Sequence, residues 1–269
     1  MSYKSVMVAV DLGEPARARV RLAAHVADDF QARLIGIAAA RPFYEGAPAG
    51  PTPGGGYCIA SDQEAVLNDL RLAHGTFTEA VAGRSRAEWR STLDFPAAFL
   101  GAQAAAGDLL VLGRGDDGSP LMSVDPGDAL MRLGMPVLIV PPRVDHLEAR
   151  RVAVAWKNTR EARRALRDAL PFLKRASGVV LIAIDDGSGA DDARDVIGLL
   201  QAHDVYATAV HQDACGTSTA EALVEAASEQ AADLIVAGGY GHGRLREWAF
   251  GGVTRDLLAG CPVCCLMSH

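Results

Sequence analysis

Residues 232–238 read Ala-Asp-Leu-Ile-Val-Ala-Gly, and residues 107–113 read Gly-Asp-Leu-Leu-Val-Leu-Gly. A second match follows, because Cys-Pro-Val-Cys-Cys-Leu at 261–266 is similar to Met-Pro-Val-Leu-Ile-Val at 135–140. The two partners lie 125 residues apart in the first match and 126 apart in the second. This nearly constant offset indicates two copies of one structural unit.

A third match sets the boundaries of the two copies. Val-Met-Val-Ala-Val-Asp at 6–11 matches Val-Ala-Val-Ala-Trp-Lys at 152–157, but here the offset is 146. The first copy is therefore about 21 residues longer, and residues 41–61, with four prolines and five glycines, are the candidate insertion. We expect a first domain at 1–141, which contains this insertion, and a second domain at 150–269.

Each copy alternates short apolar runs with helical patterns, which is typical of a doubly wound α/β fold with a parallel sheet. Residues 179–184 are apolar throughout, as expected of a central strand that is buried on both faces. Two helix starts are expected, one capped by Asn158 and one by the capping box of Ser218 and Glu221. The expected strands are 4–10, 33–39, 88–93, 108–113 and 136–141 in the first copy, and 151–156, 178–184, 205–211, 233–238 and 262–267 in the second.

A spaced glycine pattern follows the fourth strand of the second copy. Two residues separate Gly238 from Gly241, and nine separate Gly241 from Gly251. Glycines let backbone N–H groups approach phosphate oxygens, and a helix expected to begin near Gly252 would point its positive end at the same place. Open parallel sheets bind ligands at the carboxyl ends of their strands, so the pattern predicts an anion site there. The lysine-bearing P-loop is excluded, because no Gly-Lys-Ser/Thr follows.

Together with Asp11 at the end of the first strand and the closing Cys261-Pro262-Val263, this spacing resembles the universal stress protein family in its tandem form. The resemblance covers nearly the whole chain, apart from the insertion and the linker between the copies. It implies two Rossmann-like five-stranded parallel sheets in the order 3-2-1-4-5, paired through their fifth strands. It also implies that members keeping the glycine loop bind ATP, with the adenine at the ends of strands one and two.

The two copies depart from the family pattern in different ways. The first keeps Asp11, but Asp116 stands at the second glycine position of its loop, where a carboxylate repels phosphate. The second keeps the loop, but Lys157 replaces the aspartate, and Gly252 stands where the family has serine or threonine. We therefore expect a degenerate first domain and a nucleotide site in the second, with Thr254 as a substitute hydroxyl.

Several candidate site residues have two interpretations. Lys157 could contact phosphate or be a solvated lysine at a strand end, and His242 could contact phosphate or lie on the surface. Trp156 neighbours the pocket, but a large aromatic residue at this position also suits the core. By the family pattern, the backbone of Ile184 contacts adenine. No catalytic or metal-binding residue is assigned, and the candidate nucleotide-binding residues are Trp156, Lys157, Ile184, Gly238, Gly241, His242, Gly251, Gly252, Val253 and Thr254.

The composition limits the classes of partner. With 26 Lys and Arg against 33 Asp and Glu, the net charge is −7, which disfavours nucleic acid. No apolar run approaches the roughly 18–20 residues of a membrane span, and the first residues lack a signal peptide pattern. We expect a cytoplasmic protein with reduced cysteines and no membrane partner. Cys261 and Cys264 fit C-x-x-C, but their place at the last strand favours buried structural thiols over a redox or metal site.

Three functional hypotheses follow. The first is a non-enzymatic stress-response protein in which ATP or another adenine nucleotide, bound in the second domain, changes the contact with an unknown protein partner. The second is a tandem interaction scaffold that has lost nucleotide binding. The third is a slow ATPase, which is disfavoured because Lys157 occupies the place of a metal-binding carboxylate. Whether Mg²⁺ accompanies the nucleotide stays open, as does association of the internal pseudo-dimer into a homodimer.

Overall fold

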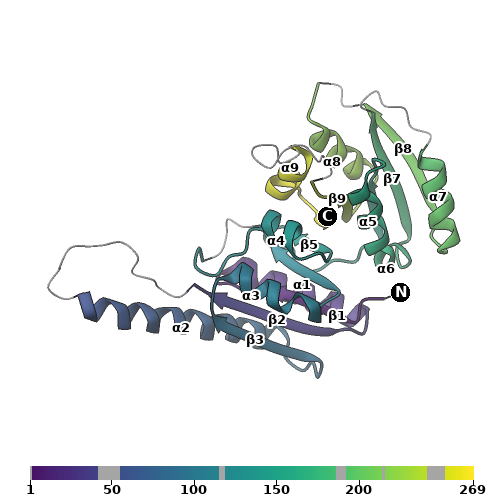
Figure 1. Ribbon diagram of the computed structural model, residues 1–269. Coiled ribbons are helices and arrows are strands. Elements are labelled where there is room, and N and C mark those ends of the chain that lie inside the picture. Colours follow the sequence, from purple (N-terminus) through teal and green to yellow (C-terminus); the bar gives the residue numbers. More distant parts are fainter. Residues whose placement is uncertain (1, 42–54, 115–118, 186–191, 214–215, 241–251) are drawn as a thin grey trace.

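The computed structural model describes residues 2–41, 55–114, 119–185, 192–213, 216–240 and 252–269 (Figure 1). The first unit comprises β1 (Ser5–Ala9), α1 (Glu14–Asp29), β2 (Arg33–Ala40), α2 (Gly55–Ala80), β3 (Ala87–Leu93), α3 (Pro96–Gln103), the 3-10 turn η1 (Ala104–Ala106), β4 (Leu109–Gly113), α4 (Pro126–Arg132) and β5 (Val137–Val140). The second unit comprises β6 (Arg151–Ala155), α5 (Arg160–Asp168), α6 (Leu170–Leu173), β7 (Gly178–Asp185), α7 (Asp192–Ala202), β8 (Ala207–Asp213), α8 (Thr219–Glu229), β9 (Leu234–Gly238), α9 (Gly252–Gly260) and β10 (Cys264–Ser268).

The strands of the described residues form one sheet in the order β3-β2-β1-β4-β5-β10-β9-β6-β7-β8. Each half is parallel and has the order 3-2-1-4-5 that the family resemblance implies. The two halves join through β5 and β10, which pair antiparallel with Ile139 opposite Cys265 and Val137 opposite Met267. Figure 1 shows the two units meeting near β5 and the C-terminus. The predicted fold class and the pairing of the fifth strands are confirmed.

Two apolar layers cover the faces of this sheet. Along β1, Val6 and Val8 enter the layer shared with α1, α2, α5, α6 and α7, whereas Met7 enters the layer shared with α3, α4, α8 and α9. All three side chains have no exposed surface. Successive side chains of a strand point to opposite faces, so a strand covered on both sides must be apolar at every position. This requirement explains the uninterrupted apolar runs in the sequence.

Several local starts and ends differ from the predictions. The N-cap of α5 is Thr159, not Asn158, because the Thr159 hydroxyl accepts from the amide of Ala162 at 3.2 Å. The Asn158 side chain instead accepts from Arg163 of the same helix. The capping box of Ser218 and Glu221 is confirmed. Strand β8 begins two residues later than expected, because the chain first turns through a left-handed residue at Asp204, and β10 likewise begins two residues late.

The extra length of the first unit lies between β2 and β3. Helix α2 has 26 residues, whereas its counterpart α7 in the second unit has 11. The end of the proposed insertion, from Gly55 onward, belongs to this helix, and its residues 42–54 lie outside the described part of the chain.

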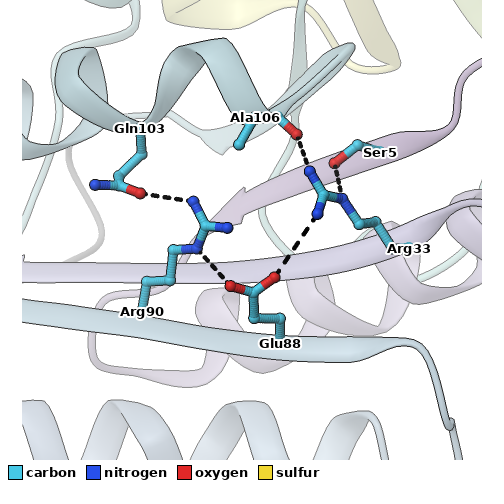
Figure 2. A network of polar contacts seen from close by, with 6 residues as sticks. All are labelled: Ser5, Arg33, Glu88, Arg90, Gln103 and Ala106. Atoms are coloured by element: carbon cyan, nitrogen blue, oxygen red, sulfur yellow. Dashed lines mark hydrogen bonds and ion pairs between the residues drawn. The ribbon is translucent and has the colours of Figure 1, made fainter.

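A polar network at the edge of the first unit connects β1, β2 and β3 with α3 and η1 (Figure 2). Glu88 on the edge strand β3 accepts from Arg90 at 2.7 Å and lies 4.0 Å from Arg33 on β2. Arg90 also donates to Gln103 at 2.6 Å. The hydrogen bond from Arg90, aided by the charges of Arg90 and Arg33, lowers the pKa of Glu88. Charged side chains on an edge strand also hinder pairing with a second chain.

An aromatic cluster in the core layer of α1 and α6 joins the two units. The rings of Tyr3 and Phe30 in the first unit meet edge to face at 5.0 Å, and both contact Phe172 of α6 in the second. The Tyr3 hydroxyl donates to the Asp168 carbonyl at 2.5 Å, and Arg175 lies over the Phe30 ring at 5.4 Å. Hydrophobic burial at this seam therefore adds to the β5–β10 pairing.

The same seam leads to a prediction about pH. Burial raises the pKa of Asp168, although Ser268 donates to its carboxylate at 2.7 Å and Arg164 lies 3.7 Å away. A carboxyl whose pKa is higher in the folded state makes folding more favourable at low pH, and this contribution is lost as pH rises from the unfolded pKa of 3.8 through the folded value. Asp168→Asn keeps an oxygen acceptor for Ser268 and removes the titration. We expect the variant to gain stability relative to the parent as pH rises from about 4 to 7 in urea unfolding. Parallel stability curves over that range would contradict this account.

Candidate functional site

A pocket of about 400 Å³ lies at the carboxyl ends of the central strands of the second unit. Its floor comes from the ends of β6, β7 and β9, and its sides come from α5, α8 and α9. This is the place at which open parallel sheets bind ligands. The lining residues are Ala155, Trp156, Lys157, Thr159, Ala162, Ile182, Ile184, Ser218, Thr219, Ala220, Leu223, Ala237, Gly238, Gly252, Val253, Thr254 and Asp256.

The structure brings together every predicted site residue that it describes. These residues are Trp156, Lys157, Ile184, Gly238, Gly252, Val253 and Thr254. The other three predicted residues, Gly241, His242 and Gly251, lie outside the described part of the chain. Segments more than 90 residues apart in the sequence thus contribute to one hollow.

Three helices begin at the wall of the pocket. The first turns of α5, α8 and α9 supply Thr159, Ser218 and Gly252 to its lining, together with their neighbours. A helix N-terminus carries unpaired backbone N–H groups and a partial positive charge. Their convergence favours an anion in the pocket. The sequence predicted Ser218 as the cap of α8 but did not assign it to the site. No local sequence pattern shows which pocket the N-terminus of a helix will line.

Gly238 has a packing role in addition to its place in the pocket. A Cβ at this position would lie 2.5 Å from the backbone nitrogen of Ala162 and 2.7 Å from the carbonyl carbon of Glu161. Both atoms belong to the first turn of α5. A backbone without a side chain is therefore needed here so that α5 can lie against the end of β9.

Thr254 is 5% exposed, and its hydroxyl oxygen accepts from the Tyr240 amide at 3.0 Å. The contact ties the start of the loop after β9 to the first turn of α9. A hydroxyl that accepts one hydrogen bond still has its own hydrogen to donate. Thr254 therefore shapes the loop, and it also keeps the donor that was predicted to substitute for a serine or threonine at position 252.

Trp156 and Lys157 follow each other at the end of β6. Trp156 is 8% exposed and belongs to the core layer of α5, α6 and α7, and its amide donates to the Ile182 carbonyl at 2.8 Å. Its indole nitrogen is buried and has no hydrogen-bond partner among the described residues. Lys157 is exposed at the pocket rim. The pocket also contains a carboxylate at Asp256, which lies 3.5 Å from Arg255.

The equivalent pocket of the first unit is filled by an arginine. Arg19 of α1 is 4% exposed, donates to the Ala9 carbonyl at 3.0 Å and pairs with Asp11 at 2.5 Å. A Cβ at Gly113, at the end of β4, would overlap the Arg19 guanidinium. The remaining space is about 20 Å³. The carboxylate of Asp11, just after β1, is thus already paired with an arginine of its own unit.

The cysteines near the C-terminus lie in the core and not in the pocket. Cys261, Cys264 and Cys265 are all buried and carry free thiols. Burial raises the pKa of Cys264 to about 12, whereas a hydrogen bond from Cys265 lowers the pKa of Cys261 to about 7. Within the described residues, no group of three or more His, Cys, Asp or Glu side chains is arranged to hold a metal ion. Likewise, none of the helices described there has the length and apolarity that crossing a bilayer requires.

The model of the universal stress protein family matches residues 148–269. A universal stress protein structure from Archaeoglobus fulgidus DSM 4304 covers 98% of this chain and 97% of its own, with a TM-score of 0.69 and 16% identity. A functionally unknown protein from Pseudomonas aeruginosa PAO1 covers 99% and 92%, with a TM-score of 0.52 and 16% identity.

A third structure, a universal stress protein in complex with cAMP, is 27% identical and covers 52% of this chain and 98% of its own, with a TM-score of 0.36. No curated protein matches the chain. The full-length match to the Archaeoglobus protein shows that the fold continues through both units. The second unit, residues 148–269, thus matches the universal stress protein family, and the whole chain shares its fold with the Archaeoglobus universal stress protein.

Proposed function

We propose that the second unit binds one adenine nucleotide, ATP or a close relative, and that occupancy of this site regulates contacts of the chain during a stress response. The observation that carries the proposal is the meeting of three helix N-termini around a pocket of about 400 Å³ that contains the predicted residues. A volume of this size suits a small organic ligand. The match of residues 148–269 to the universal stress protein family supports the stress-related role.

The phosphate end of the ligand belongs beside α5, α8 and α9. The backbone N–H groups of their first turns offer hydrogen-bond donors, and Lys157 at the rim adds a positive charge. The donor hydrogen of Thr254 lies on the same wall. These groups stabilise an anion without requiring a carboxylate-held metal ion, so we propose that Mg²⁺ is dispensable for binding.

The base end belongs against the apolar part of the wall. Ile182 and Ile184 on β7 face the pocket together with Leu223 of α8 and Ala155 of β6. An aromatic base gains free energy by leaving water for such a surface. The place agrees with the expectation that adenine lies at the ends of the first two strands of the unit.

One site per chain is expected, because Arg19 fills the pocket of the first unit. That unit nevertheless keeps its complete sheet and both apolar layers. The same observation favours a second candidate, in which the whole chain is an interaction scaffold and the open pocket is a remnant. A slow ATPase is a weaker candidate, since Lys157 stands where a metal-binding carboxylate would lie.

Calorimetric titration of the full chain with ATP, ADP, AMP and cyclic AMP, each with and without Mg²⁺, tests the proposal. We expect saturable binding of at least one nucleotide at one per chain. Mass spectrometry of the small molecules released from freshly purified, denatured protein provides an independent measurement. Absence of binding for all four nucleotides and of released nucleotide would favour the scaffold. Phosphate release that exceeds that of the Lys157→Ala variant would favour the ATPase.

Lys157 provides a specific prediction. If its charge contacts phosphate, Lys157→Ala should weaken ATP binding about tenfold, which is the loss expected for one hydrogen bond to a charged group. The loss should be smaller for adenosine and should shrink as salt is added. Lys174→Ala, at another exposed lysine of the same unit, is the matched control. Equal losses for ATP and adenosine would mean that Lys157 is only a solvated residue at a strand end.

A further inference from the structure

We propose that the first unit positions residues 238–240, the start of the glycine loop of the second unit, through contact of α4 with Tyr240, so that ligand affinity in the second pocket depends on the first unit. The inference rests on the proposed function and extends it to the unit whose own pocket is filled. Tyr240 acts here as a positioning residue. Its ring is directed toward the first unit, while its backbone is bonded to a residue of the pocket wall.

The loop start is fixed on the second-unit side by its backbone. Gly238 lines the pocket, the Gly239 amide donates to the Ser268 carbonyl at 2.8 Å, and the Tyr240 amide donates to Thr254 at 3.0 Å. Tyr240 has a φ of +54°, a left-handed conformation that is unfavourable for a residue with a bulky side chain. Such a conformation persists only where surrounding contacts hold it. The described contacts that can hold it come from both units.

The contacts on the first-unit side involve α4. The Tyr240 hydroxyl packs so closely on Gly127, in the first turn of α4, that a Cβ there would overlap it. A Cβ at Gly239 would likewise overlap the side chain of Leu130, one turn further along the same helix. Burial, and next the charge of the α4 N-cap Asp125, raise the pKa of Tyr240, as expected of a phenol held at this junction.

A set of hydrogen bonds also connects the end of α4 to α5 and to the start of the loop. Arg164 of α5 donates to the carbonyl of Gly134, in the turn after α4, and to the carbonyl of His269 at the end of the chain. The His269 ring in turn lies 3.0 Å from the Gly239 carbonyl. Figure 1 shows α4 beside α9 and the C-terminus. The loop start is therefore enclosed by α4, α5 and the C-terminal residues.

The consequence for the pocket follows from Thr254. Its hydroxyl oxygen accepts a hydrogen bond from the Tyr240 amide, and it belongs to the first turn of α9, which lines the pocket. A displacement of Tyr240 would release Thr254 and shift Gly238, two residues away. Both belong to the wall that we assign to phosphate.

Gly127→Ala in the full chain tests the proposal, because the added methyl group must push the Tyr240 ring away. We expect about tenfold weaker binding of the nucleotide that the parent protein binds most tightly, within the usual range of coupling between sites. The same substitution in a Tyr240→Ala background should have no further effect, since the overlapping hydroxyl is gone. Gly75→Ala, at a helical glycine of the first unit with open space around it, is the control. Parent-like affinity of folded Gly127→Ala, or an equal loss in both backgrounds, would overturn the inference.

Two further measurements separate this inference from its alternatives. Hydrogen exchange of the Tyr240 amide requires no ligand: exchange should be slow in the parent and faster in Gly127→Ala, and unchanged exchange would overturn the inference even if no nucleotide binds. Tyr240→Gly relieves the left-handed backbone. If the Tyr240 ring only filled space and did not position the loop start, this variant should bind the nucleotide as well as the parent does. The proposal instead requires weaker nucleotide binding. If Gly127→Ala does not fold, Tyr240→Phe replaces it in the binding and hydrogen-exchange measurements. This variant removes only the hydroxyl, so we expect a smaller loss of nucleotide affinity.

Discussion

Gly238→Ala is expected to weaken the proposed nucleotide binding by at least about a hundredfold. The new methyl group would lie 2.5 Å from the backbone nitrogen of Ala162. A helix backbone cannot yield as a flexible side chain can, so the first turn of α5 must move. That movement carries Thr159 away from the pocket and misplaces one of the three helix N-termini. Overpacking of this kind also costs about 1–3 kcal/mol in the free energy of unfolding.

The measurement is calorimetric titration of folded Gly238→Ala with the nucleotide that the parent binds, together with urea unfolding. Gly198→Ala is the matched control, because Gly198 lies in α7 of the same unit with open space around it. The control should bind like the parent and gain a little stability from the better helix propensity of alanine. Retained affinity in Gly238→Ala would show that the α5 N-terminus does not contact the ligand.

Phe172→Ala should produce the largest loss of stability, about 3–5 kcal/mol in the free energy of unfolding. Phe172 is 4% exposed, and its ring lies 5.1 Å from Phe30 and 5.6 Å from Tyr3. Truncation removes its contacts with both rings and leaves a cavity at the seam between the units. Because the two other rings belong to the first unit, unfolding of the two units should also become less cooperative.

Urea unfolding followed by both circular dichroism and tryptophan fluorescence checks this result. Trp89 reports on the first unit, and Trp156 and Trp248 report on the second. Phe95→Ala is the control, since Phe95 is 50% exposed and should cost far less. A loss below about 1 kcal/mol in Phe172→Ala would mean that the aromatic cluster contributes little to joining the units.

The local errors of the sequence analysis have simple physical causes. Asn158 and Thr159 are adjacent and both cap helices well, so the choice between them depends on where the backbone turns. The expected strand at 205–211 begins at Val205, which is buried but lies in the turn before β8. In most strands the buried apolar residues also pair with a neighbouring strand, but Val205 is buried and precedes the paired residues of β8.

The sequence predicted several of the residues that line the candidate site, but it did not predict how the surrounding helices and side chains are arranged. The glycine spacing and the repeat selected Gly238, Gly252 and Thr254, which all line the pocket. The same reasoning expected a degenerate first pocket because of Asp116, which lies outside the described residues, and it did not foresee that Arg19 occupies that pocket. No motif indicates Arg19, because an arginine on a helix is ordinarily a surface residue.

The repeat and its apolar periodicity determined the α/β class and the doubled unit, and family resemblance added the strand order, because these features are written in local patterns that recur along the chain. Three features were decided only by the tertiary structure: the filling of the first pocket by Arg19, the meeting of three helix N-termini at the second, and the contact of Tyr240 with α4. Each depends on the direction in which a side chain or helix end points once elements distant in sequence have packed. That direction follows from the fit of whole elements against one another, which no local stretch of residues encodes.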